Sequence, residues 1–249
     1  MVELTDILLA CASFGPALLL MFLTLRDYTF PKVEKPFFDD PKLFMMFTLG
    51  IVLGMVFFFI DTAITFSVVT IILVAMGVPI LQSLIKLSIL NFPKFQRKVD
   101  TAFYGLALGL GISTTYAFSR MYEAVHDPSM MGLGSTDALL SMALIIMMGV
   151  QIVLIQGSTT GLIAIGCARG QPWSYFAYSL MYALGYSALL YGSAVAADMA
   201  GDFAAIGVIL AAWLVAAYSY WHIYVIDYPN LIDDAKRGMK RAKKMKKTL

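Results

Sequence analysis

Charged residues are scarce in this chain of 249 residues, and histidine and cysteine are scarcer still. Only 14% of the residues are charged, whereas 60% are apolar; a soluble domain has about 25% charged and about 45–50% apolar residues. The two cysteines, Cys11 and Cys167, lie in apolar segments and indicate neither a metal site nor a redox site. Together with a mean hydropathy of +0.79, these scarcities exclude a soluble enzyme and a disulfide scaffold and indicate an integral membrane protein.

Familiar catalytic and cofactor-binding motifs are missing as well. The sequence has no Ser/His/Asp or Cys/His arrangement and no H-E-x-x-H motif, and its two histidines, His126 and His222, are too few for a histidine-rich metal centre. Nothing resembles a phosphate-binding glycine loop or a nucleic-acid-binding surface. We therefore expect no metal, no cofactor and no nucleic-acid partner.

Apolar stretches long enough to cross a bilayer occupy nearly the whole chain. A hydrocarbon core of about 30 Å takes roughly 20 residues of helix. The stretches are Ile7–Leu25, Leu43–Ile60, Ala63–Leu90, Thr101–Ala124, Ala138–Ala168, Trp173–Ala197 and Phe203–Ile226. The sequence thus predicts an all-α fold, with a seven-helix transmembrane domain over 1–228 and a basic cytoplasmic tail over 229–249.

The basic residues lie almost entirely on one side of this predicted topology. The side of the amino terminus is mainly acidic, and Arg120 is its only nearby cation, whereas the other side holds the basic connections and the cations of the tail. Because lysine and arginine accumulate on the cytoplasmic side, the amino terminus is predicted outside and the carboxyl terminus in the cytoplasm. We expect the plasma membrane of a prokaryote.

Polar residues inside the predicted spans are the candidates for function, since each must find a partner there. Lys86 lies about one helical turn from the cytoplasmic end of its span, and Gln82 precedes it by four residues on the same helix face. Lys86 either extends to the lipid headgroups or points with Gln82 into the bundle. The spacing of Gly105 and Gly109, with Gly111 and Gly161, predicts close helix packing.

Three segments resemble the superfamily of PrsW-type intramembrane proteases and the Aph subunit of gamma-secretase. Residues 79–86, Pro-Ile-Leu-Gln-Ser-Leu-Ile-Lys, resemble the Pro-x-x-Glu-Glu-x-x-Lys element of the proteases. Asp100 and residues 104–111 resemble the family's Asp-Gly-x-x-Tyr-Gly-x-x-x-Gly-Leu-Gly helix start. Residues 11–17 are similar to the first helix of Aph, which also carries Phe-Gly-Pro-Ala. The resemblance covers roughly residues 7–200, and it implies seven spans with an outside amino terminus.

The chain departs from the family at the catalytic positions. Gln82 and Ser83 stand where the proteases have two glutamates, and Tyr116 and Ala117 stand where the family has Glu-Asn. The expected histidines align with Gln156 and Tyr182. Proteolysis by this fold needs a water polarised by a carboxylate or by a carboxylate–histidine metal site. The resemblance therefore implies an inactive relative in which neutral side chains form one buried hydrogen-bond network. The residues predicted at these positions are Gln82, Ser83, Lys86, Tyr116, Gln156 and Tyr182.

Three functions follow from this reading. The first is a catalytically inactive membrane scaffold or partner-binding subunit, with other membrane proteins as partners. The second is a small-solute transporter or channel whose path is lined by the same polar residues. The third is an active intramembrane protease with a non-standard site. A continuous route past Gln82 and Gln156 favours transport, whereas a closed centre or an opening toward lipid favours the scaffold or protease.

The carboxyl-terminal tail is strongly basic. From Lys236 to Leu249, eight of 14 residues are lysine or arginine. They are Lys236, Arg237, Lys240, Arg241, Lys243, Lys244, Lys246 and Lys247. The tail is either a solvated anchor that enforces orientation or a short helix that lies on anionic lipids of the cytoplasmic leaflet.

Overall fold

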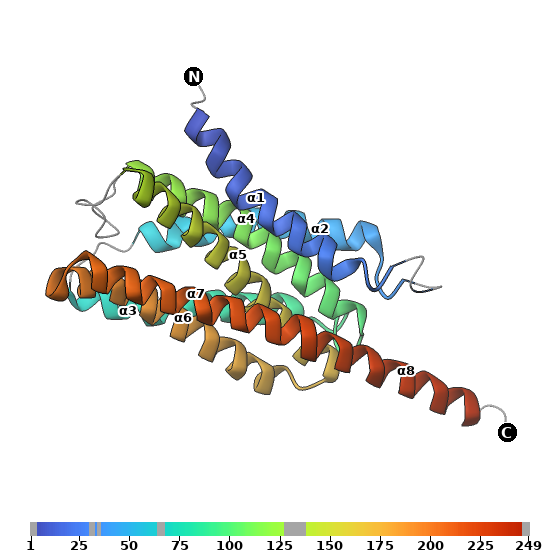
Figure 1. Ribbon diagram of the computed structural model, residues 1–249. Coiled ribbons are helices and arrows are strands. Elements are labelled where there is room, and N and C mark those ends of the chain that lie inside the picture. Colours follow the sequence, from blue (N-terminus) through green and yellow to red (C-terminus); the bar gives the residue numbers. More distant parts are fainter. Residues whose placement is uncertain (1–3, 30–32, 34–35, 64–67, 127–137, 246–249) are drawn as a thin grey trace.

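The computed structural model describes residues 4–29, 33, 36–63, 68–126 and 138–245, and the regular structure in these residues is helical (Figure 1). The helices are α1 (Leu4–Leu25), α2 (Asp40–Thr62), α3 (Val68–Leu90), α4 (Asp100–His126), α5 (Ala138–Arg169), α6 (Pro172–Ala200) and α7 (Asp202–His222), followed by the π-helix η2 (Ile223–Asp227) and α8 (Tyr228–Met245). The predicted all-α class is confirmed, and each predicted stretch corresponds to one helix.

Five helical segments are long and apolar enough to cross a membrane. They are α1, α2, α5, α6 and the continuous segment that runs from α7 through η2 into α8. Large apolar side chains on their outer faces are exposed, among them Phe22, Phe44 and Phe59. Such a surface is suited to contact with lipid tails, since a soluble protein rarely exposes large contiguous apolar patches. Seven spans with an outside amino terminus stay a prediction.

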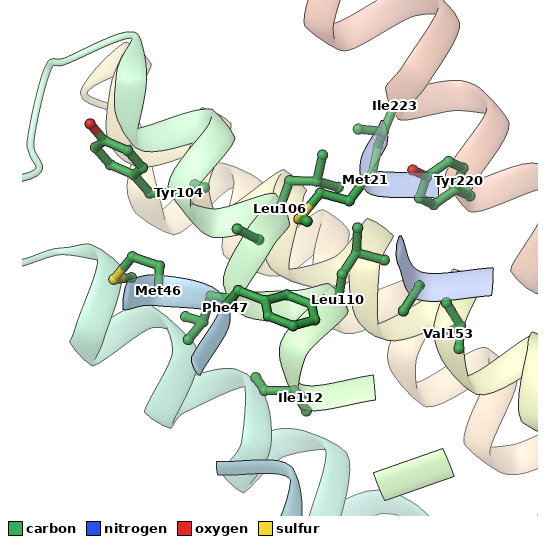
Figure 2. Packing of buried hydrophobic residues seen from close by; sticks show 14 of the residues in the cluster. Met21, Met46, Phe47, Tyr104, Leu106, Leu110, Ile112, Val153, Tyr220 and Ile223 are labelled. Carbon is green, nitrogen blue, oxygen red and sulfur yellow. The ribbon is translucent and has the colours of Figure 1, made fainter. Parts of the chain in front are cut away.

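The central helix is α4, which packs against α1, α2 and α5. Every residue from Thr101 to Thr114 is buried. Figure 2 shows Leu106, Leu110 and Ile112 of α4 among apolar side chains of its neighbours. Helix α4 is less apolar than the five candidate membrane-spanning segments. Its central position accounts for this difference, since its neighbours are protein side chains and not lipid tails.

Glycines let the backbones of α2, α4 and α5 approach closely. A Cβ on Gly105 would lie 2.1 Å from the Ala164 Cβ, and one on Gly109 would lie 2.5 Å from the Gln156 carbonyl oxygen, both on α5. On the opposite side of α4, a Cβ on Gly111 would lie 2.1 Å from the Phe47 carbonyl oxygen of α2. The predicted packing role agrees with this geometry at all three glycines.

Gly161 is different from the other three glycines. A Cβ there would first meet the Tyr228 hydroxyl at 3.5 Å, which is an ordinary van der Waals distance. Gly161 therefore lies in the packed interior, but its neighbours do not require a glycine.

The carboxyl-terminal part of the chain is one nearly continuous helix. In Figure 1, α8 continues the line of α7 and projects beyond the bundle. The first turn of α8 still belongs to the core, since Leu231 and Ile232 are buried and the Tyr228 hydroxyl donates to the Ala102 carbonyl oxygen at 2.8 Å. The Asp234 carboxylate also lies 3.7 Å from the Arg169 guanidinium group of α5, so the beginning of α8 contacts the bundle. The division of the chain at residue 228 stays a prediction.

The predicted basic tail is helical up to Met245. The backbone of α8 includes Lys236, Arg237, Lys240, Arg241, Lys243 and Lys244, whereas Lys246 and Lys247 lie outside the described residues. The helix agrees with one of the two predicted forms of the tail, and its contact with anionic lipids stays a prediction.

Candidate functional site

A polar cavity lies between α3, α4, α5 and α6. Its volume is about 50 Å³, measured as the space open to water-sized molecules, and it is partly open to the outside. Its polar lining consists of Gln82, Ser83, Lys86, Tyr116, Arg120, Gln156, Thr159, Tyr186, Ser187 and Tyr191. Valine, isoleucine and leucine side chains, such as Val78 and Ile155, complete the wall. A mainly apolar wall with a few converging polar groups is typical of a ligand site.

The shape of α3 contributes to this cavity through Pro79, which lies inside the helix and lines the wall. Proline has no backbone N–H, so the carbonyl group of Ala75 loses its helical donor. The following turns of α3 carry Gln82, Ser83 and Lys86, which line the same cavity.

Lys86 is a fully buried basic side chain of the cavity wall. It is 2% exposed. Its ammonium group donates to the Gln156 Oε1, and it lies 3.3 Å from the Thr159 Oγ1. Of the two predicted positions for Lys86, the structure has the inward one, so the side chain does not reach the headgroups.

In this network Lys86 donates a hydrogen bond to Gln156, and Gln156 donates one to Gln82. An ammonium group has only donors, so Gln156 must offer its amide oxygen to Lys86. The Gln156 Nε2 is then the donor to the Gln82 Oε1, at 3.0 Å. Because Gln82 accepts through its oxygen, its NH₂ group is left to donate to another partner. The network thus ties α3 to α5 and ends in a donor at the cavity wall.

A charged cluster forms the other end of the cavity. The carboxylate of Asp61, at the end of α2, is 0% exposed and lies 3.6 Å from the Arg120 Nη1. The hydroxyl groups of Tyr116 and Tyr191 donate to its two oxygens at 2.9 and 3.0 Å. Arg120 also binds the Glu123 carboxylate at 2.8 Å. Arg120 is therefore shared by two carboxylates, and the acidic groups outnumber the basic group at this end.

The structure brings most of the predicted polar residues to one place, but not into one network. Gln82, Gln156 and Lys86 are bonded to each other, whereas Ser83 and Tyr116 line the same cavity and Tyr116 bonds to Asp61.

Tyr182 is not among the residues that line the cavity, and its predicted place in the network stays a prediction. The cavity-facing positions of α6 are Ala183, Tyr186, Ser187, Leu190 and Tyr191. These are three or four residues apart and form one helix face. Tyr182 lies beside that face, and its ring centroid is 6.4 Å from that of Tyr218 on α7.

Sequence reasoning missed Asp61, Arg120, Tyr186 and Tyr191. Asp61 was expected at the membrane surface because it ends an apolar stretch. One signal pointed to the cluster: Arg120 is the only nearby cation on a side of the topology that is otherwise acidic. A solitary arginine within an apolar helix indicates a carboxylate partner.

The described residues contain no group of three or more His, Cys, Asp or Glu side chains placed to hold a metal ion. The site residues are hydroxyl, amide, amine and guanidinium groups around one carboxylate. This arrangement can bind a small polar molecule through hydrogen bonds.

Comparisons of the chain with protein-family models, with curated proteins and with solved structures gave no match. The relationship to the PrsW and Aph superfamily therefore stays a prediction.

Proposed function

We propose that the protein is a small-solute transporter of the membrane, without catalytic activity, whose polar cavity binds the solute. One observation carries the proposal: ten polar side chains, two of them basic, line a cavity inside a bundle whose outer surface is apolar. Polar and ionisable groups at such depth are costly and are kept where they bind or move something. A cavity enclosed by four helices provides the binding step that a carrier needs.

The chemistry of the site supports binding over catalysis. A hydrolase of this fold needs a carboxylate that accepts a proton from water. Asp61 contacts the cavity lining, and both its oxygens already accept hydrogen bonds from tyrosines while Arg120 lies beside it. Its oxygens are thus occupied by protein donors and not by a water molecule. An active protease with a non-standard site is the least supported of the three functions.

We place the protein in the plasma membrane of a prokaryote, with seven spans and the amino terminus outside. The support comes from the distribution of lysine and arginine along the sequence. In this orientation Lys86 lies toward the cytoplasmic end of the cavity, and the Asp61–Arg120 pair lies toward the outer end.

The test is a binding screen on the purified protein in lipid nanodiscs. The unfolding temperature is measured with a thiol-reactive dye, because Cys167 is buried and reacts only on unfolding. Exposed Cys11 is replaced by serine. The panel contains alcohols, amines, carboxylates, sugars and amino acids. We expect at least one class to raise the unfolding temperature, and the same class to be taken up by proteoliposomes.

A matched pair of variants shows whether binding takes place in the cavity. Ala183→Trp fills the cavity, whereas Ala188→Trp adds the same bulk to an exposed position of the same helix. We expect the solute to stabilise Ala188→Trp and not Ala183→Trp. If no class stabilises the protein, or if Ala183→Trp responds like the unchanged chain, the proposal is wrong.

A membrane scaffold or partner-binding subunit is the second candidate. It is favoured by the hydrogen-bonded network of Gln82, Gln156 and Lys86, which joins α3 to α5. A buried network of this kind fixes the register of the helices, as a scaffold requires. Copurification from native membranes in mild detergent separates the two. A stoichiometric membrane partner, with no solute effect in the screen, would support the scaffold.

A further inference from the structure

One basic group of the cavity lining has no carboxylate partner among the described residues. Lys86 is fully enclosed, and its hydrogen-bond acceptors there are two neutral groups, Gln156 and Thr159. The other basic side chain of the lining, Arg120, is paired with Asp61 and Glu123. The charged form of a buried amine is strongly unfavourable without a partner. An anion bound beside Lys86 would stabilise that charged form.

The cavity lining offers hydrogen-bond donors to a ligand. An ammonium group has three N–H donors, and two acceptors are present among the described residues. The Gln82 oxygen accepts from Gln156, so its NH₂ group is the side that can donate to a ligand. The hydroxyl group of Tyr186 lines the same cavity, is buried, and has no hydrogen-bond partner among the described residues. A buried polar group without a partner needs an explanation, and a bound acceptor provides one.

The remaining wall restricts the shape of the ligand. Val74, Val78, Ile152, Ile155 and Leu190 line the cavity together with the polar groups. An anion surrounded by water, such as a free phosphate ion, would leave this apolar surface unused. An anion with a hydrocarbon chain would cover it, and its burial would contribute about 0.8 kcal/mol for each CH₂ group.

We propose that the solute is a monocarboxylate with a hydrocarbon chain, whose carboxylate binds Lys86, Gln82 and the Tyr186 hydroxyl and whose chain lies against the valine and isoleucine wall. This inference rests on the proposed solute-binding function. One negative charge is expected, because one basic group of the lining lacks a carboxylate. The same chemistry comes from two sources, a fatty acid of the bilayer or a short carboxylate of the aqueous phase.

Three probes with the same six-carbon chain test the charge. Hexanoate, hexanol and hexylamine are added to the Cys11→Ser protein in nanodiscs, and binding is measured from the shift of the unfolding temperature and from the NMR signal of ¹³C-carboxyl hexanoate. We expect saturable binding of hexanoate and at least about tenfold weaker binding of hexanol, which lacks a charge-assisted hydrogen bond. Hexylamine should not bind, because its charge repels Lys86.

Two variants test the residues. Lys86→Met keeps the length and removes the charge, and Lys98→Met makes the same change at an exposed position. We expect about tenfold or greater loss of hexanoate binding in Lys86→Met and no loss in Lys98→Met. Tyr186→Phe removes a hydroxyl group without a protein partner, so it should keep its unfolding temperature without ligand and still bind hexanoate several-fold more weakly. This variant keeps the test valid if Lys86→Met does not fold.

The outcomes separate this inference from the proposed function. If hexanol or hexylamine binds as well as hexanoate and only Ala183→Trp abolishes binding, the cavity binds a solute but the anion assignment is wrong. If hexanoate binds equally to Lys86→Met and Tyr186→Phe, the assignment is also wrong. If no probe and no panel solute binds, both proposals fail. The source is identified by comparing oleate supplied in the bilayer with hexanoate supplied in water. Tighter binding of oleate indicates a fatty acid of the bilayer, and tighter binding of hexanoate indicates a short carboxylate of the aqueous phase.

Discussion

A single methyl group at Gly111 tests the packing of the central helix. In the structure, a Cβ at this position would lie 2.1 Å from the Phe47 carbonyl oxygen and 3.0 Å from the Gly50 Cα. Ordinary van der Waals contact begins at 3.4 Å, so α2 and α4 would have to separate by roughly 1.3 Å. Both obstacles belong to the backbone, and no rotation of a side chain relieves them.

The cost of this substitution follows from the separation of the two helices. Overpacking a core by one methyl group costs about 1–3 kcal/mol when side chains adjust, and we expect the upper end of this range because backbone must move. The better helix propensity of alanine returns at most about 1 kcal/mol. For a chain of this length, a net loss of about 2 kcal/mol lowers the unfolding temperature by roughly 4–8 °C.

The assay follows the reaction of Cys167 with a thiol-reactive dye during heating. Cys167 is 0% exposed, so its reaction reports unfolding, and Cys11→Ser removes the exposed thiol. Gly192→Ala is the matched control, because this glycine lies inside α6 and a Cβ there meets nothing within 4 Å. We expect the control to be unchanged or slightly stabilised. Equal unfolding temperatures for the two variants would refute the close approach of α2 and α4.

Four further predictions follow from the described contacts. Gly161→Ala should leave the unfolding temperature unchanged or raise it, since a Cβ there meets its first neighbour at 3.5 Å; a fall of several degrees in the same assay would contradict this geometry. Asp61→Asn should cost roughly 3 kcal/mol, because it removes the buried partner of Arg120, and an unfolding temperature like that of the unchanged chain would show that the pair is not formed. Tyr228→Phe should cost about 1 kcal/mol through the lost bond to the Ala102 carbonyl oxygen, and the dye assay measures it. A fluorophore on Met239→Cys, in the Cys11→Ser background, should be quenched by brominated anionic lipids at low salt and less at high salt. Equal quenching at both salt concentrations would contradict electrostatic binding of α8 to the lipid surface.

The helices could be predicted from the sequence because their signal is strong. Each is an apolar stretch of about 20 residues or more, and its ends coincide with charged residues, proline or glycine. The depth of each helix in the bundle was harder to predict. The glycines of α4 indicate close packing, but only the three-dimensional arrangement shows that α4 and the second half of α5 are enclosed, whereas α1, α2 and α6 expose large apolar side chains.

The candidate site could be predicted in part. Gln82, Lys86 and Gln156 are conspicuous because they are polar and interrupt apolar helices, and the structure joins them. The place of Tyr182 was inferred from the family resemblance, in which it aligns with an expected histidine. A helix has 3.6 residues per turn, so residues four apart drift around it, and the cavity-facing stripe passes through Tyr186 and Tyr191 instead.

Asp61 shows why the end of an apolar stretch is a poor indication of exposure. A charged residue at such an end is expected at the membrane surface, where water solvates it. Helix α2 has 23 residues, whereas α4 has 27 and α6 has 29, and side chains of these two longer helices surround the end of α2. Tyr116 and Arg120 come from α4, and Tyr191 comes from α6. The burial of Asp61 is thus decided by the lengths of its neighbours, and the pair that it forms with Arg120 closes the end of the cavity opposite Lys86.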